Sequence, residues 1–171
     1  MKIFTVPNII SFIRILLSPL FFLLFFFEFN FFGLIVFLIA AFSDFLDGFF
    51  ARRLKQESKL GKFIDPFADK LMIALAVIVL VMYFDFPALG LMILFRDLIS
   101  LLGFFYVQFI DKKIEFKVSS LGKTTTLFQI ITFLVFVIDY EYKLIILVIT
   151  IIVSLAAGIA YLVKGIKALN R

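Results

Sequence analysis

Six long apolar stretches dominate this sequence and restrict what the chain can fold into. Each one approaches the roughly 20 residues that an α-helix needs to cross the hydrocarbon core of a bilayer. They cover residues 9–27, 32–50, 67–84, 89–109, 121–138 and 144–163. Apolar residues make up 64% of the 171-residue chain, which is more than a water-soluble domain of this size can bury. We therefore predict an all-α, polytopic membrane protein with six transmembrane helices in a single domain, residues 1–171.

The positions of Lys and Arg predict the orientation, because cytoplasmic loops of membrane proteins are enriched in both. With the N-terminus in the cytoplasm, the only basic residue in an outside loop is Lys143. Twelve fall in inside segments: Lys2, Arg52, Arg53, Lys55, Lys59, Lys62, Lys112, Lys113, Lys117, Lys164, Lys167 and Arg171. We expect a multi-pass protein of the cell (inner or plasma) membrane with both termini cytoplasmic. The net charge of +5 then suits anionic lipid, and no nucleic-acid partner is expected.

Cys and His are both absent from the chain. Their absence excludes a thiolate nucleophile, acid–base chemistry at an imidazole and zinc sites built from these residues. A metal site here has to use oxygen ligands, which favours Mg²⁺, Mn²⁺ or Ca²⁺.

Several ionisable residues lie within the apolar stretches or at their ends, where facing lipid would cost roughly 2.5–3.5 kcal/mol each. They are Arg14, Asp44, Asp47, Asp65, Asp69, Lys70, Arg96, Asp97 and Lys123. We expect their side chains to face the interior of the helix bundle or a wet cavity. For Lys70 and for the Arg96–Asp97 pair, snorkelling or an internal salt bridge explains the residues equally well.

Four of the aspartates form two pairs that flank one basic loop. Asp44 and Asp47 are three residues apart, and Asp65 and Asp69 are four apart, so each pair lies on one face of a helix. Two antiparallel helices can bring the four carboxylates together. Carboxylates about 4 Å apart repel by about 4 kcal/mol at an effective dielectric constant near 20, so such a cluster binds protons or cations. Four carboxylates could bridge two divalent ions. A cation transporter is the alternative from another functional class, although the aspartates gather near one membrane face.

Small residues and an arginine accompany these aspartates. Gly48 and Ala51 leave room for a ligand near the backbone, and Arg52 offers a forked donor for phosphate. Close helix packing is the alternative explanation for the two small residues. Asp65 before Pro66 also suits a helix N-cap, and the two roles are compatible.

The pattern Asp44-x₂-Asp47-Gly48-x₂-Ala51-Arg52-x₈-Gly61-x₃-Asp65-x₃-Asp69 resembles the complete signature of the CDP-alcohol phosphotransferase family. The resemblance implies an integral membrane enzyme, usually a homodimer, whose site opens to the cytosol and in which an alcohol displaces CMP from a CDP-linked partner. It implies that Asp44, Asp47, Asp65 and Asp69 hold two Mg²⁺ or Mn²⁺ ions and that Asp69 is also the general base. The positions that resemble nucleotide contacts are Asn8, Gly48, Ala51, Arg52, Ser58 and Gly61.

Further motifs are similar to the members that transfer a phosphatidyl group from CDP-diacylglycerol to glycerol 3-phosphate, which gives phosphatidylglycerophosphate and CMP. They are residues 6–11 with Arg14 and Pro19, residues 65–70, Arg96-Asp97, and residues 122–126 followed by Gln129. This resemblance implies that Arg96 and Lys123 bind the acceptor phosphate. Thr125 stands where a second Lys is common. Cardiolipin synthases share much of this pattern, so they are the alternative, as are members that use another alcohol. Ser154 and Gly158 in the last stretch indicate either close helix contact or ordinary core packing.

Overall fold

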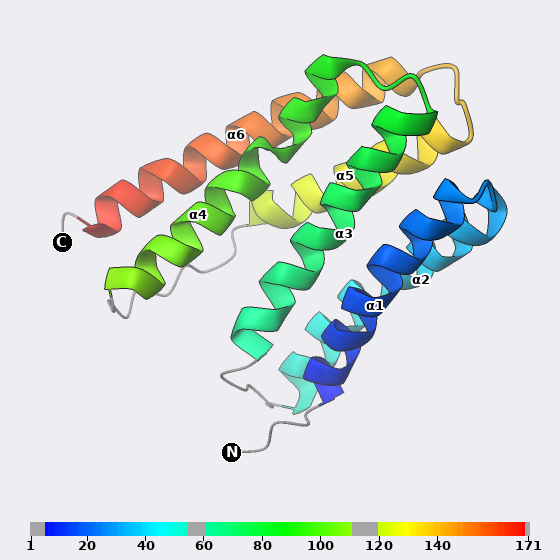
Figure 1. The fold of residues 1–171 in the computed structure, drawn as a ribbon. Helices are drawn as coiled ribbons and strands as arrows, with labels where there is room; N and C mark the ends of the chain where they lie inside the picture. Colours follow the sequence, from blue (N-terminus) through cyan, green and yellow to red (C-terminus); the bar gives the residue numbers. More distant parts are fainter. Residues whose placement is uncertain (1–5, 55–60, 111–119, 170–171) are drawn as a thin grey trace. The chain divides into compact units, whose positions relative to one another are not determined.

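The structure of the protein, a computed structural model, describes residues 6–54, 61–110 and 120–169 (Figure 1). Every regular element within these ranges is a helix, which confirms the all-α prediction. The elements are α1 (Val6–Phe26), α2 (Asn30–Leu54), α3 (Gly61–Tyr83), η1 (Ala88–Leu94, a 3-10 helix), α4 (Phe95–Ile110), α5 (Ser120–Val137) and α6 (Lys143–Leu169). Two segments in the described ranges, Asn8–Phe26 and Lys143–Ile166, are long and apolar enough to cross a membrane.

The fourth apolar stretch differs from its prediction as one helix. It is divided into η1, with seven residues, and α4, with 16 residues, which follow each other directly. Pro87 caps η1 in an extended conformation, and the Gly90 amide donates a hydrogen bond to the Pro87 carbonyl at 2.7 Å. A Cβ atom at Gly90 would collide with the ring of Phe86, which packs edge-on against Phe136 with centroids 5.0 Å apart. Hydropathy alone does not distinguish the 3-10 helix η1 from a first part of an α-helix.

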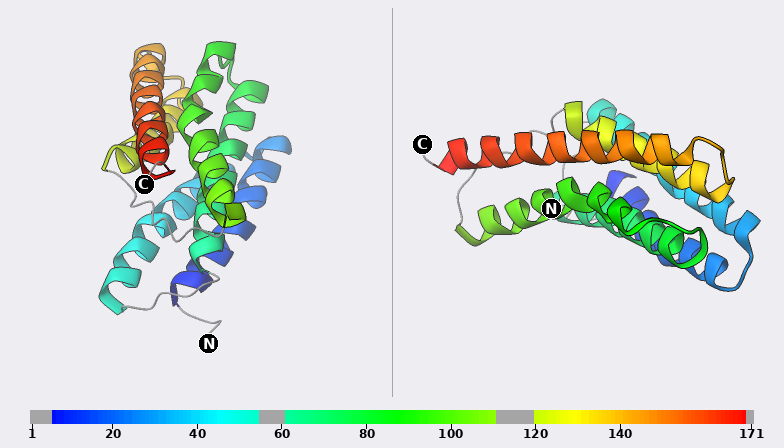
Figure 2. Two further views of the ribbon diagram at one scale, coloured as in Figure 1. Left: turned by 90° about the vertical axis from the view of Figure 1, so that its left-hand side faces the viewer. Right: turned by 90° about the horizontal axis from the view of Figure 1, so that it is seen from above.

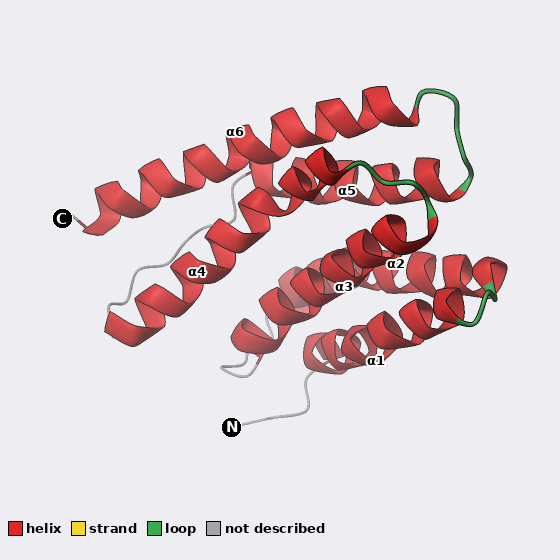
Figure 3. Cartoon of the chain, turned by 45° about the horizontal axis from the view of Figure 1, so that its top comes forward, coloured by secondary structure: helices red, strands yellow, loops and turns green. Residues whose placement is uncertain are grey.

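Contacts divide the chain into two compact units, Met1–Val79 and Leu80–Arg171. In the first unit, α1 and α2 pack along each other as a helical hairpin (Figure 3). The turn uses Glu28 in the left-handed conformation, with φ of 64°. The amide of Phe29 donates to the carbonyl of Leu24 at 2.8 Å, which satisfies one free carbonyl at the end of α1. The interface is aromatic, since Phe21 and Phe37 are fully buried and meet edge to face with centroids 5.4 Å apart.

In the second unit, α6 lies against α5, α4 and η1 (Figure 2). The α5–α6 turn places Asp139 in the left-handed conformation, with φ of 52°. Between these two helices, the hydroxyl oxygens of Thr132 and Thr150 are 2.7 Å apart in the buried interface. A Cβ atom at Gly158 would lie 2.8 Å from the ring of Phe95. The absence of a side chain at this position therefore lets α6 approach α4 closely, as the first of the two sequence interpretations proposed.

Candidate active site

The eight signature positions lie in the second half of α2 and in the first half of α3, two consecutive helices. Asp44, Asp47, Gly48, Ala51 and Arg52 belong to α2, and Gly61, Asp65 and Asp69 belong to α3. The backbone is helical at all of these positions, which is the condition for the predicted sharing of a helix face within each aspartate pair. Apart from Asp69, the signature side chains lie outside the described part of the chain, and Ser58 lies outside it entirely. The convergence of the four carboxylates therefore stays a prediction.

Asp69 is the signature aspartate whose side chain the structure describes. Its carboxylate forms an ion pair with the guanidinium of Arg14 in α1. Arg14 is fully buried, whereas the side chain of Asp69 is 34% exposed. The carboxylate is thus anchored on one side and reachable on another, which suits a group that must exchange a proton or bind a cation. The burial of Arg14 confirms that its side chain faces the interior, whereas its pairing with Asp69 was not predicted from the sequence.

Arg14 is part of a polar stripe on α1. Asn8, Ser11, Arg14 and Ser18 are all buried, and their spacing places them on one side of the helix. The Nε atom of Arg14 donates to the hydroxyl of Ser43 in α2 at 3.3 Å, and that hydroxyl donates to the carbonyl of Ala40 at 2.7 Å. A buried guanidinium requires such partners because an unpaired charge in an apolar interior is very unfavourable. The predicted nucleotide contact Asn8 lies at the start of this stripe.

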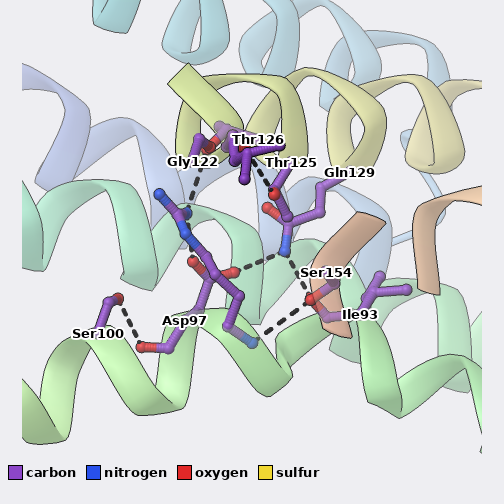
Figure 4. Close-up of polar contacts among 10 residues, drawn as sticks. Ile93, Asp97, Ser100, Gly122, Thr125, Thr126, Gln129 and Ser154 are labelled. Carbon is purple, nitrogen blue, oxygen red and sulfur yellow. Dashed lines mark hydrogen bonds and ion pairs between the residues drawn. The ribbon is translucent and has the colours of Figure 1, made fainter. Parts of the chain in front are cut away.

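A second polar cluster surrounds the junction between η1 and α4 (Figure 4). Nη1 of Arg96 donates to Oδ1 of Asp97 at 2.8 Å, which is the internal salt bridge that the sequence allowed. The side-chain amide of Gln129 in α5 donates to Oδ2 of Asp97 at 2.6 Å and to the carbonyl of Ile93 at 2.7 Å. The hydroxyl of Ser154 in α6 donates to the same carbonyl at 2.8 Å. Side chains from α5 and α6 therefore bind the backbone at this junction, and Gln129 of α5 also binds the Asp97 carboxylate that pairs with Arg96.

Arg96 also lies against the first turns of α5. A Cβ atom at Gly122 would be 2.5 Å from a terminal guanidinium nitrogen of Arg96. Arg96 donates a long hydrogen bond of 3.5 Å to the hydroxyl of Thr126. Lys123 follows Gly122 directly, and its side chain is exposed. The two predicted acceptor-phosphate residues, Arg96 and Lys123, thus come from neighbouring positions of one unit.

The family model for CDP-alcohol phosphatidyltransferases matches residues 4–156, which is most of the chain and includes both polar clusters. The chain belongs to this family. Membership favours an enzyme over the cation transporter that the sequence left open. Members of the family are membrane-associated and generally metal-dependent.

Three curated relatives illustrate what this family member resembles, and each is named CDP-diacylglycerol–glycerol-3-phosphate 3-phosphatidyltransferase. The protein from Aquifex aeolicus is 33% identical over 174 residues, covering 95% of this chain and 96% of the relative. The protein from Pectobacterium atrosepticum is 36% identical over 134 residues, covering 74% of this chain and 72% of the relative. That of Pseudomonas fluorescens is 48% identical over 79 residues, covering 44% of this chain and 40% of the relative.

The oxygen ligands that the family signature offers suit a hard divalent cation. Its candidate ligands are all carboxylates, and the one described among them, on Asp69, remains partly exposed beside its ion pair. Among the side chains that the structure describes, no group of three or more potential metal ligands was found. Asp44, Asp47 and Asp65 are not among those side chains.

Proposed function

We propose that this protein transfers the phosphatidyl group of CDP-diacylglycerol to glycerol 3-phosphate, which gives phosphatidylglycerophosphate and CMP. The observation that carries the proposal is the intact signature in α2 and α3, in a chain that aligns over 95% of its length with a relative named for this reaction. Motifs beyond the signature support the same acceptor, because Arg96-Asp97 and residues 122–126 resemble those of members that use glycerol 3-phosphate, and Arg96 packs against Gly122.

The reaction is a single displacement at phosphorus. A hydroxyl oxygen of glycerol 3-phosphate attacks the phosphorus linked to diacylglycerol, the bond to the CMP oxygen breaks, and CMP leaves. An alcohol is a weak nucleophile at neutral pH, so a base must accept its proton. The chain has no His or Cys, and Asp69 is the proposed base. Arg14 orients the Asp69 carboxylate through their ion pair.

Asp44, Asp47, Asp65 and Asp69 are proposed to hold two Mg²⁺ or Mn²⁺ ions. Bound there, the ions would neutralise the negative charge that builds on the pyrophosphate during transfer. The nucleotide part of the donor is assigned to Asn8, Gly48, Ala51, Arg52, Ser58 and Gly61, where small residues leave space and Arg52 offers two parallel hydrogen bonds to phosphate.

The phosphate of the acceptor is assigned to Arg96 and Lys123. Arg96 is held by Asp97, while Lys123 is exposed and supplies a mobile point charge. An acceptor without a phosphate would make both cations dispensable. The effect of removing these cations therefore distinguishes glycerol 3-phosphate from acceptors without a phosphate, such as serine or inositol.

The membrane arrangement is part of the same proposal. Six spans, with η1 and α4 together forming the fourth, place both termini in the cytoplasm and the site at the cytosolic face of the plasma membrane. The two apolar segments Asn8–Phe26 and Lys143–Ile166 support the first and last spans. Lipid enters from the bilayer, the soluble acceptor enters from the cytosol, and the enzyme is a single-domain homodimer.

An acceptor panel with labelled CDP-diacylglycerol tests the proposal. Purified enzyme should form phosphatidylglycerophosphate with glycerol 3-phosphate, and little or no lipid product with serine, inositol phosphate or phosphatidylglycerol. Cardiolipin formation from phosphatidylglycerol, with glycerol 3-phosphate inactive, would instead identify a cardiolipin synthase.

A further inference from the structure

Gln129 occupies the centre of the polar cluster at the η1–α4 junction. Its side chain is 2% exposed, and its amide nitrogen binds two oxygens, Oδ2 of Asp97 and the carbonyl of Ile93 (Figure 4). Reversing the amide would turn its oxygen toward these two acceptors, so the hydrogen-bonding network itself determines the orientation. Gln129 is therefore committed to donating both hydrogen bonds.

The oxygen of the same amide accepts no hydrogen bond from any described residue and is buried. A buried carbonyl oxygen without a donor destabilises a fold, so an apolar side chain of the same length would pack at this position without that penalty. What only the amide provides is its pair of hydrogen bonds. One of them holds the carboxylate that binds Arg96.

Arg96 is thereby restrained from two sides. Asp97 binds its guanidinium at 2.8 Å, and the guanidinium packs so closely against Gly122 that a Cβ atom there would lie 2.5 Å from it. A free arginine side chain loses considerable rotamer freedom when it binds a phosphate, and an arginine that is already fixed loses less. The cluster thus holds the Arg96 guanidinium in place before any ligand binds.

We propose that Gln129 and Asp97 are positioning residues that hold the Arg96 guanidinium against Gly122 for binding the phosphate of the acceptor. This inference rests on the proposed function, since it assumes that the acceptor bears a phosphate and that Arg96 binds it. Gln129 acts through Asp97 and Arg96 and does not itself touch the substrate.

The test compares steady-state kinetics of the full-length enzyme with each substrate varied in turn. Gln129→Met keeps the side-chain length and removes both donors. We expect it to raise KM for glycerol 3-phosphate at least about tenfold, as for the loss of a hydrogen bond to a charged group, while KM for CDP-diacylglycerol changes less than about twofold. Gly122→Ala, which displaces the guanidinium without removing a buried polar group, should cause the same selective rise.

A double-mutant cycle identifies the route of the effect. If Gln129 acts through Arg96, the double variant Arg96→Ala with Gln129→Met should bind glycerol 3-phosphate no more weakly than Arg96→Ala alone. Thr132→Val is the matched control, because it removes a buried hydrogen bond between α5 and α6 one helical turn away. It should leave both KM values unchanged.

The outcomes separate the two claims. Wild-type enzyme that releases no CMP with glycerol 3-phosphate would contradict the proposed function, and the positioning role with it. Active wild-type enzyme whose KM for glycerol 3-phosphate is unchanged in both Gln129→Met and Gly122→Ala would overturn the positioning role alone. Fully additive effects of Arg96→Ala and Gln129→Met would overturn it as well.

Discussion

The guanidinium of Arg14, fully buried in α1, forms an ion pair with the carboxylate of Asp69 in α3, 55 residues further along the chain. The pair joins the first apolar helix to the last position of the family signature. A charge buried this deeply needs a fixed counter-charge. The same contact therefore stabilises the first unit and fixes the orientation of the proposed base.

Asp69→Asn should abolish CMP release while the protein stays folded. The amide oxygen can still accept a hydrogen bond from Arg14, but the side chain can no longer take a proton from the acceptor hydroxyl at neutral pH. Activity is measured as CMP formed from CDP-diacylglycerol, and folding by thermal unfolding in detergent. Full turnover in this variant would remove Asp69 as the base.

Removing one partner of the ion pair should have unequal effects on stability. Asp69→Ala takes this carboxylate away from a fully buried guanidinium and should cost about 3 kcal/mol. Arg14→Met leaves behind a carboxylate that is 34% exposed and able to recruit water, so it should cost about 1–2 kcal/mol. Denaturant or thermal unfolding of the two variants provides the comparison. Equal losses of stability in the two variants would contradict the expectation that the buried Arg14 depends on its partner more than the partly exposed Asp69 does.

Gly158→Ala should destabilise the second unit, against the usual preference of helices for alanine. A Cβ atom there would lie 2.8 Å from Cδ1 of Phe95 and 3.3 Å from Cδ1 of Ile99, so α6 has to move away from α4. We expect a loss of about 1–3 kcal/mol. The control is Gly165→Ala at a half-exposed position of the same helix, which should gain up to about 1 kcal/mol from helix propensity. Unfolding curves that rank the two variants in the opposite order would contradict the close α4–α6 packing.

The absence of cysteine makes the topology directly testable. Tyr140→Cys, in the α5–α6 turn, should react with a membrane-impermeant maleimide on intact cells because this turn is predicted to lie outside. Lys113→Cys should react only after the membrane is permeabilised. The reverse pattern would invert the proposed orientation, and labelling of both sites in intact cells would contradict the six-span arrangement.

Much of the architecture follows from the sequence because hydropathy is a local property. The apolar stretches predicted the helices, and the spacing of Asp44, Asp47, Asp65 and Asp69 placed each pair on one helix face. The 3-10 start of the fourth stretch was not predicted, because it depends on how Gly90 packs against the ring of Phe86.

The sequence does not predict which distant positions pair, because these pairings depend on how the helices pack. Nothing in the pattern around Arg14 indicates that its partner is Asp69, although a lone arginine within an apolar helix does indicate that a partner exists. The salt bridge of Arg96 with Asp97 was accessible from adjacency, but the role of Gln129 depends on helix packing. A charged residue in an apolar segment can thus be recognised from the local sequence, whereas its partner can be identified only from the three-dimensional structure.

The most direct test of the central claim is the stoichiometry of transfer with purified enzyme, CDP-diacylglycerol and glycerol 3-phosphate labelled with ³²P. We predict one CMP released for each label that enters the lipid phase as phosphatidylglycerophosphate, and loss of both signals when EDTA removes divalent ions, with recovery on addition of Mg²⁺ or Mn²⁺. CMP release without label in the lipid, or transfer that persists in excess EDTA, would contradict the account.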